Sequence, residues 1–570
     1  MHLLRSRDRG SLHTRSRSSA LLAVCFVVAA ILPDCVLANT ENYAPWTVEA
    51  SILLPLGFYM MWSVALRRSG VMIWLGFPFI FLCAFQLVLL GLFGNSVIAA
   101  DMFTNLLTTN PGEAHEVLEH ILPSMVLVCV LYVPLLWFAA REIGLRRTLS
   151  RTARTTIGLT GAAVFALGLL ALWPAYRASE ERHVLRDEIF PLNVIYNMGL
   201  SGREFRKARH YPETSKGFRF EAVREAEAPG REIYLYIIGE ASRAQSWRLF
   251  NAESEHATNP RLSREEGLVL FRDMLTQSNT THKSVPMILS PVTTDRHDDL
   301  FRCKGLPALF NEAGFDTWFI SNQSRQGAMI DHLAADARHR IYIRAPRYDM
   351  QLLDEMRKAV AKSEAPKMLF ILHCYGSHFD YRKRYPSGFA RFKPDDDASI
   401  TPENARDLRN AYDNTILYTD HFLSEIIGFL RGLEGTTSAM LYCADHGEDL
   451  LDDARGRFLH ATPTTTAYQL WVASLAWFSD DYCARFPEKA AAAAANSTAP
   501  ANTHALFHTM ADIASIGTPR LDRTVSLVSE DYDRAAARYY LSDHNEAVPY
   551  VGTGLTSEDM ELLERHGIKP

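Results

Sequence analysis

Cysteine is scarce in this sequence, and no two cysteines are closely spaced. The chain of 570 residues contains eight cysteines and no Cys-x-x-Cys pair, which argues against a zinc site built from thiolates. Only four cysteines follow the apolar first third of the chain: Cys303, Cys374, Cys443 and Cys483. These four allow one or two disulfides whose pairing stays open, and they do not indicate a disulfide-rich scaffold.

A strong net charge is also absent. The formal charge is only −6, and there is no basic footprint typical of a nucleic-acid-binding protein, so we expect no nucleic-acid partner. The apolar residues are unevenly distributed, because they crowd into roughly the first third of the chain. A chain of this length is too long for one compact core, so two or more domains are expected.

The first third contains five apolar segments, each near the roughly 20 residues that a helix needs to cross a bilayer. They cover about 20–37, 46–66, 71–93, 121–140 and 156–173. Arginines precede the first segment and occupy the second and fourth loops between segments, whereas the loops 38–45 and 94–120 contain no Lys or Arg. The positive-inside rule therefore predicts a cytoplasmic amino terminus and, after five spans, an external remainder. Alternatively, the first segment is a cleaved signal peptide, which leaves the later domain on the same side.

Two polar stretches border these segments. The acidic loop 101–120 has two interpretations. It is either an ordinary solvated loop, or it folds back over a functional site, where Asn105 and Glu113 would contact a lipid headgroup. The segment 177–230 contains an amphipathic stretch that either bridges along the membrane surface or forms an ordinary linker helix. The predicted domains are therefore 1–176, 177–230 and 231–570.

From about Arg231 onward, short apolar runs alternate with helical patterns. The runs are IYLYIIG, LVLFRDM, TWFIS, MLFILHC and SAMLYCADHG, and helices are predicted over 306–313, 349–361 and 403–433. This alternation predicts an α/β domain whose mostly parallel sheet is covered by helices on both faces. The low-complexity stretch 490–501 predicts a loose surface insertion.

Two of the predicted strands end in candidate metal ligands. Glu240 follows IYLYIIG, and Asp445 and His446 follow the later strand. Open α/β folds build their sites at the carboxyl edge of the sheet, and carboxylate and imidazole ligands suit zinc. We expect a fourth ligand from the polar run 277–286, and the candidates are Ser278, Thr280, Thr281, His282 and Ser284. A hydroxyl group bound to zinc becomes a nucleophile at neutral pH.

Six motifs together resemble those of a known family. They are GEASR at 239–243, TNP at 258–260, NTTHKSVP at 279–286, HCYGSH at 373–378, DHGE at 445–448 and YQLWV at 468–472. They resemble the phosphoethanolamine transferases, membrane-anchored members of the alkaline phosphatase/sulfatase superfamily that include lipid A modifying enzymes and the mobile colistin-resistance enzymes. The resemblance covers nearly the whole chain. It implies an enzyme of the bacterial inner membrane with its catalytic domain in the periplasm.

The resemblance implies roles for single residues. Thr281, five residues before Pro286, matches the nucleophile of the family. The implied zinc ligands are Glu240, Thr281, Asp445 and His446. His378 and His460 match histidines near the substrate phosphate or a second metal, so one zinc ion is expected and a second is allowed. Asn322 matches an asparagine that contacts the headgroup.

The resemblance also implies a two-step transfer. The zinc-activated threonine attacks phosphatidylethanolamine, diacylglycerol leaves, and an acceptor takes phosphoethanolamine from the covalent intermediate. The histidines act as general acid and base. The lipid A branch flanks its threonine motif with a disulfide, whereas Gln277 and Met287 occupy those positions here. This difference favours the branch that modifies lipopolysaccharide core sugars or other glycans, although lipid A stays an alternative acceptor.

Other functions compete with this interpretation. A phosphoglycerol transferase or a phosphatase/sulfatase-type hydrolase would use the same fold. A sulfatase would carry a Cys/Ser-x-Pro-x-Arg motif, which the run 277–286 lacks. A rival from another class is a non-catalytic envelope-assembly protein, which predicts that a Thr281→Ala variant keeps full function in cells.

Overall fold

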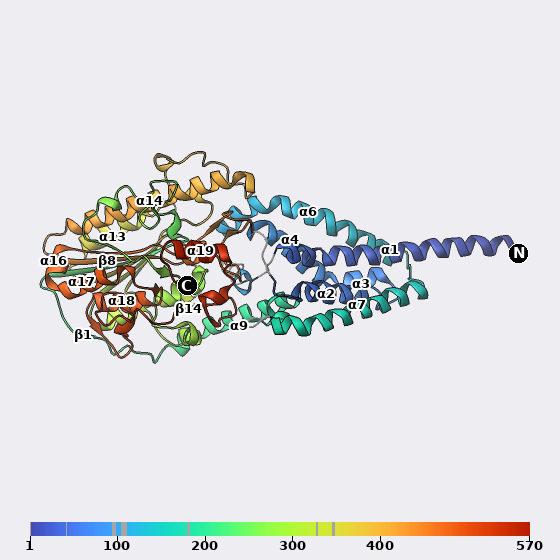
Figure 1. The fold of residues 1–570 in the computed structure, drawn as a ribbon, viewed down its shortest axis with the longest axis horizontal. Helices are drawn as coiled ribbons and strands as arrows, with labels where there is room; N and C mark the ends of the chain where they lie inside the picture. Colours follow the sequence, from blue (N-terminus) through green and yellow to red (C-terminus); the bar gives the residue numbers. More distant parts are fainter. Residues whose placement is uncertain are drawn as a thin grey trace. The chain divides into compact units, whose positions relative to one another are not determined.

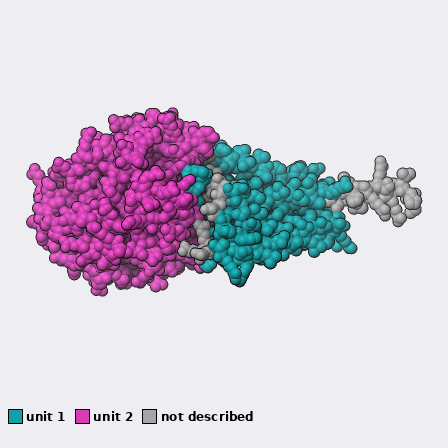
Figure 2. All heavy atoms as spheres, in the orientation of Figure 1, with its two compact units in different colours: residues 1–100, 117–200, 453–457 teal, residues 101–116, 201–452, 458–570 magenta. Residues whose placement is uncertain are grey.

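The computed structural model describes residues 2–40, 43–93, 99–103, 111–178, 183–325, 329–344 and 348–570. The chain forms two compact units (Figure 2). Unit 1 comprises residues 1–100, 117–200 and 453–457, and unit 2 comprises residues 101–116, 201–452 and 458–570. Unit 1 is helical, whereas unit 2 combines strands and helices.

The apolar first third is helical over most of its described length. Its helices are α1 (His2–Thr40), α2 (Thr47–Ser63), α3 (Ser69–Leu75), α4 (Phe77–Phe93), α6 (Pro111–Gly144) and α7 (Arg151–Ala178). Among the described residues, three stretches are long and apolar enough to cross a membrane: Arg17–Asn39, Ile121–Gly144 and Arg151–Ala178. The pair α3 and α4, bent by 59°, makes a fourth if it counts as one span. Since the 17 residues of α2 extend only about 26 Å, the count of five spans stays a prediction.

Helices α2 and α7 approach each other closely because glycines line their contact. A Cβ atom at Gly57 would lie 2.5 Å from the backbone nitrogen of Phe165, and one at Gly161 would lie 2.8 Å from the Cβ of Met60. Small residues of this kind let the backbones of membrane helices approach. A Cβ atom at Gly158 would meet only Val64, at 3.6 Å, so the contact loosens near the start of α7.

Unit 2 is built on a seven-stranded mixed sheet in the order β3–β11–β8–β2–β7–β5–β6. Its strands are β2 (Arg231–Gly239), β3 (Leu268–Leu270), β5 (Asp316–Ser321), β6 (His339–Tyr342), β7 (Lys367–His373), β8 (Thr436–Ala444) and β11 (Ser474–Phe478). Strands β8, β2, β7, β5 and β6 run parallel, and β11 runs antiparallel to β8 and β3. The predicted, mostly parallel sheet is therefore confirmed. The exception is β11, which runs opposite to both of its neighbours.

Helices accompany the sheet. The main ones are α10 (Thr281–Ile288), α11 (Leu306–Glu312), α13 (Met350–Lys362), α14 (Ala405–Arg431) and α18 (Ala505–Ile513). Helices α11, α13 and α14 lie where the apolar periodicity predicts them, whereas α10 and α18 were not predicted. In Figure 1, α13 and α14 lie on one side of β8, and α18 lies on the other side. Every residue of β2 after Arg231 is buried, as expected for a strand covered on both faces.

Two sequence-based expectations for unit 2 are wrong. The stretch 490–501 is not a loose insertion, because helix α17 (Pro487–Ala495) occupies its first half and buries Ala492 and Ala493. Alanine has the highest helix propensity, which explains why a low-complexity run folds here. The run LVLFRDM is not one strand, because it divides into β3 and β4 (Met274–Leu275), and β4 pairs with β12 (Ala501–Asn502).

The remaining helices and strands are mostly short, apart from α9 (Leu192–Thr214), which adds Ala208 and Tyr211 to the core. The others are α8 (Val184–Asp187), α12 (Met329–Ala334), α15 (Ala467–Leu470), α16 (Asp480–Arg485), α19 (Ser557–Arg565), β1 (Val223–Arg224), β9 (Asp449–Leu450), β10 (Phe458–Leu459), β13 (Ile516–Gly517), β14 (Tyr539–Leu541) and β15 (Ala547–Pro549). All eight cysteines are free, so none of the four in the later part of the chain forms a disulfide.

Candidate active site

The candidate site lies where the central strands of the sheet end. Gly239 of β2 pairs with Ala444 of β8, so the residues that follow, Glu240 and Asp445, leave the sheet side by side. On the other side of β2, Ile238 pairs with His373 of β7. The three loops that follow β2, β7 and β8 therefore meet at the carboxyl edge of the sheet, as expected for an α/β site.

Three predicted metal ligands form one buried cluster at this edge. Donor atoms of Glu240, Asp445 and His446 all lie within 4.8 Å of one another. The hydroxyl oxygen of Thr281 lies 3.1 Å from His446 Nε2 and 3.2 and 3.3 Å from the two carboxylate oxygens of Glu240. The structure thus brings together the four residues that the family resemblance implies as zinc ligands.

Thr281 differs from the other three residues in its exposure. Glu240, Asp445 and His446 are fully buried, whereas Thr281 is half-buried at the first position of α10. The amino terminus of a helix carries a partial positive charge and free N–H groups that favour anions. A phosphate group could therefore reach Thr281 without reaching the buried side chains.

The hydrogen bond of the His446 ring identifies its tautomer. Nδ1 lies 2.8 Å from the carbonyl oxygen of Gly447, and a carbonyl oxygen only accepts hydrogen bonds. Nδ1 therefore carries the proton, and the lone pair of Nε2 faces Thr281. This is the arrangement typical of metal-binding histidines, whose second nitrogen donates to a carbonyl or carboxylate group.

Gly447 itself allows a close approach of two chain segments. Its N–H donates to the carbonyl oxygen of Gln469 at 2.8 Å, and a Cβ atom at this position would overlap the carbonyl oxygen of Tyr468. Any larger residue at position 447 would therefore push these segments apart beside the cluster.

The cluster contains two buried carboxylate groups, from Glu240 and Asp445, and its described members include no lysine or arginine to balance them. Burial, and then the neighbouring Asp445, raise the pKa of Glu240 well above its usual value. Oδ2 of Asp445 is buried without a hydrogen-bond partner among the described residues, while Oδ1 accepts from the N–H groups of Ala241 and His446. A divalent cation would supply the missing charge and a partner for this oxygen, so the residues fit a metal site.

A second group of potential ligands adjoins the first. Donor atoms of His446, Glu448 and His460 lie within 4.8 Å of one another, and His460 Nδ1 lies 2.7 Å from Glu448 Oε2. Burial raises the pKa of Glu448 to about 7 and lowers the pKa of His460 to about 3. Neutral imidazole is the form that binds metals. Because the one free lone pair of His446 faces the first cluster, Glu448 and His460 are the members of this group that would hold a second ion.

His378 lies in the loop that follows β7 and is half-buried. Its Nδ1 lies 2.6 Å from the carbonyl oxygen of Phe379, which leaves the lone pair on Nε2. Arg384 Nε donates to the carbonyl oxygen of His378 at 2.8 Å and so holds this loop. His378 is thus positioned by its backbone contacts, and its role toward substrate stays a prediction.

Of the three proposed headgroup contacts, the structure describes only the side chain of Asn322. Asn322 is fully buried and donates from Nδ2 to Asp349 at 2.8 Å. Asn105 lies outside the described residues, and Glu113 lies in α6 with its side chain outside the described part. Their contacts with a headgroup stay predictions.

Two residues were not predicted from the sequence. Gln323 contacts a site residue, and Asp101 contacts the side chains next to Thr281. Gln323 donates from Nε2 to Glu240 Oε2 and to the carbonyl oxygen of Cys374, both at 2.8 Å. Asp101 lies 3.2 Å from His282 Nε2 and 2.8 Å from Lys283 Nζ, the side chains that follow the threonine in sequence. Gln323 closely follows β5 at the carboxyl edge of the sheet, and this position is a signal that the sequence offers. For Asp101 the only signal in the sequence is its place in an acidic loop.

Two family models match this chain. The sulfatase model matches residues 232–516, and the model described as phosphoethanolamine transferase EptA/EptB matches residues 77–204. Together they cover the sheet with its candidate site and much of the helical first third.

Individual relatives extend over most of the chain. A Kdo(2)-lipid A phosphoethanolamine 7''-transferase of Salmonella typhimurium is 27% identical over 69% of this chain and 73% of its own. The integral membrane protein lipooligosaccharide phosphoethanolamine transferase A (EptA) from Neisseria meningitidis has a TM-score of 0.71 at 20% identity, covering 90% of this chain and 98% of its own. The C-terminal periplasmic domain of EptC from Escherichia coli, in complex with Zn, has a TM-score of 0.52 at 22% identity over 59% of this chain and 97% of its own.

Proposed function

We infer that this chain, which belongs to the sulfatase family and within it to the membrane-anchored phosphoethanolamine transferases, transfers phosphoethanolamine from phosphatidylethanolamine to a glycolipid of the bacterial envelope. The observation that carries this proposal is the position of the Thr281 hydroxyl, 3.1 Å from His446 Nε2 and 3.2 Å from Glu240. The acceptor is of the lipopolysaccharide type, modified on a core sugar or on lipid A, since a relative is a Kdo(2)-lipid A phosphoethanolamine transferase. The enzyme works at the inner membrane with its catalytic domain in the periplasm.

Zinc is the metal that we propose for the buried cluster. Its ligands would be Glu240, Thr281, Asp445 and His446, and a protein of the same fold has been obtained in complex with Zn. Bound zinc would lower the pKa of the Thr281 hydroxyl and stabilise negative charge on the phosphoryl oxygens. A second ion would use Glu448 and His460, since the one free lone pair of His446 belongs to the first ion.

The reaction proceeds in two displacements at phosphorus. In the first, Thr281 Oγ1 gives its proton to water and forms a bond to phosphorus, while the bond to the diacylglycerol oxygen breaks and that oxygen takes up a proton. In the second, an acceptor oxygen loses its proton and forms a bond to phosphorus, while the bond to Thr281 Oγ1 breaks and this oxygen takes a proton back from water. His378, half-buried in the loop after β7, is the candidate for protonating the diacylglycerol oxygen and for deprotonating the acceptor hydroxyl. His460, paired with Glu448, would contact the phosphate or hold the second ion.

Lipid mass spectrometry of cells that express the wild-type chain, Thr281→Ala or Thr281→Ser tests this proposal. We expect a phosphoethanolamine increment on core oligosaccharide or lipid A with the wild type, and at least about a 1,000-fold lower transfer rate with Thr281→Ala, because the nucleophile is lost. Thr281→Ser keeps a hydroxyl group and should retain part of the activity.

Other outcomes point to other functions. A phosphoglycerol increment, or hydrolysis without transfer, would assign the chain to a different reaction of the same fold. Full function of a folded Thr281→Ala variant would indicate a non-catalytic envelope protein. Purified protein without stoichiometric zinc would contradict the metal assignment.

A further inference from the structure

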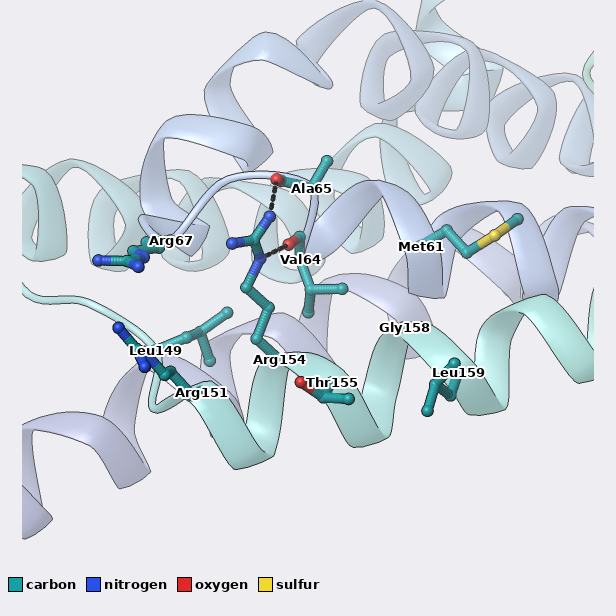
Figure 3. Close-up of a pocket in the computed structure, with 10 residues that line it drawn as sticks. All are labelled: Met61, Val64, Ala65, Arg67, Leu149, Arg151, Arg154, Thr155, Gly158 and Leu159. Carbon is teal, nitrogen blue, oxygen red and sulfur yellow. Dashed lines mark hydrogen bonds between the residues drawn. The ribbon is translucent and has the colours of Figure 1, made fainter.

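A basic pocket lies in unit 1 between the end of α2 and the start of α7 (Figure 3). Its volume of about 490 Å³ falls within the range of small-molecule sites. The charged lining residues are Arg67, Arg151 and Arg154, and none of the described residues that line the pocket is acidic. An anionic ligand is therefore the complementary one.

Arg154 forms a fixed wall of this pocket. Its Nε donates to the carbonyl oxygen of Val64 at 2.9 Å and its Nη2 donates to that of Ala65 at 2.7 Å (Figure 3). Carbonyl groups at the end of a helix lack partners within the helix. The guanidinium group of Arg154 is thus engaged in holding α2 to α7.

Arg67 and Arg151 are available to bind a ligand. Both side chains are exposed, and within the described part of the chain neither guanidinium group has a hydrogen-bond or ion-pair partner. Figure 3 shows that both extend to the same end of the pocket. Two guanidinium groups placed together suit the oxygens of one phosphate group.

The other end of the pocket is apolar. Met61 and Leu159 lie there, away from Arg67 and Arg151 (Figure 3). The gap exists because Gly158 carries no side chain and a Cβ atom there would meet only Val64, at 3.6 Å. A ligand that fills the whole pocket therefore has a phosphate at one end and a hydrocarbon chain at the other.

We propose that this pocket binds an anionic glycerophospholipid of the cytoplasmic leaflet, with its phosphate between Arg67 and Arg151 and an acyl chain against Gly158. The basic loops place this end of α2 and α7 at the cytoplasmic surface, where anionic lipids attract basic residues. All lining residues belong to unit 1, whereas the catalytic cluster belongs to unit 2. Because the proposed topology places the pocket on the cytoplasmic side and the catalytic domain outside, this lipid is distinct from the phosphatidylethanolamine donor.

Native mass spectrometry of the purified full-length chain in detergent tests the proposal, with phosphatidylglycerol as the probe. The variant Arg67→Gln/Arg151→Gln should bind phosphatidylglycerol about thirtyfold more weakly, since each basic residue near an anionic headgroup contributes about a factor of five. The matched control is Arg68→Gln/Arg146→Gln, which removes two exposed arginines from the same loops without changing the pocket lining. We expect this control to bind like the wild type.

A steric variant distinguishes binding in the pocket from a general attraction of the lipid to the basic loops. Gly158→Leu keeps every arginine but fills the gap, and it should also weaken binding; it carries the test if the double arginine variant does not fold. Equal weakening by both double variants, or by neither, would overturn the proposal. Equal binding of phosphatidylethanolamine, or displacement of the lipid by inorganic phosphate alone, would also overturn it.

Discussion

At the scale of single residues, the Gln323 side chain orients the Glu240 carboxylate. Its amide holds Glu240 Oε2 at 2.8 Å and is itself held by the carbonyl oxygen of Cys374. Hydrogen bonds of this kind orient metal ligands, and their loss typically weakens metal binding about 10–100-fold. We therefore expect Gln323→Ala to lower zinc affinity by that factor, measured by competition with a chelator.

A buried glutamine elsewhere in unit 2 provides the control. Gln245 donates to the carbonyl oxygen of Ala467 at 2.9 Å and does not contact the cluster. Gln245→Ala should leave zinc affinity unchanged even if it lowers the melting temperature. Equal zinc affinity of Gln323→Ala and the wild type would show that Gln323 does not position Glu240.

The sequence predicts those site residues that follow directly from strand ends. Glu240 and Asp445 follow apolar strands, and the parallel register of β2 and β8 brings them together. Gln323 also follows a strand, but its contact with Glu240 depends on the order of β5, β7 and β2 in the sheet, which the sequence pattern does not give. Asp101 meets His282 from 181 positions away, and no local pattern encodes such a contact.

At the scale of elements, the packing of α2 against α7 depends on glycine. A methyl group at Gly161 would lie 2.8 Å from the Cβ of Met60 and 3.1 Å from the carbonyl oxygen of Gly57, and neither atom can move without its helix. Gly161→Ala should therefore destabilise the chain by roughly 1–3 kcal/mol, as overpacking does. The measurement is the melting temperature of the purified protein in detergent.

Gly158→Ala, in the same helix, is the matched control. Its added methyl group would meet only Val64, at an ordinary contact distance of 3.6 Å, so the melting temperature should stay close to that of the wild type. The same loss of stability in both variants would trace the effect to α7 itself rather than to its contact with α2.

The elements that the sequence predicts best are the long, periodic ones. The predicted helix over 403–433 corresponds to α14 (Ala405–Arg431), and IYLYIIG lies within β2. The run LVLFRDM divides because its first three residues pair with β11, whereas its last residue, Met274, pairs with β12. Such a change of partner depends on distant segments, so periodicity within the run could not reveal it.

At the scale of the whole molecule, the number of spans decides on which side of the membrane the catalytic residues lie. Three long described helices satisfy the length and composition of a span, and the bent pair α3 and α4 makes four. With a cytoplasmic amino terminus, four spans would leave Thr281 in the cytoplasm. Only if α2 also crosses does the bent pair agree with an external site and with Arg67 and Arg68 on the cytoplasmic side.

Reporter fusions on either side of α2 test this topology. A reporter enzyme that is active only outside the cytoplasm should be active when fused after Ala44, inactive after Arg68 and active after Pro570, because α2 returns the chain to the cytoplasm and an odd number of spans places its end outside. A fluorescent reporter that works only in the cytoplasm should give the inverse pattern. Activity after both Ala44 and Arg68 would show that α2 does not cross the membrane.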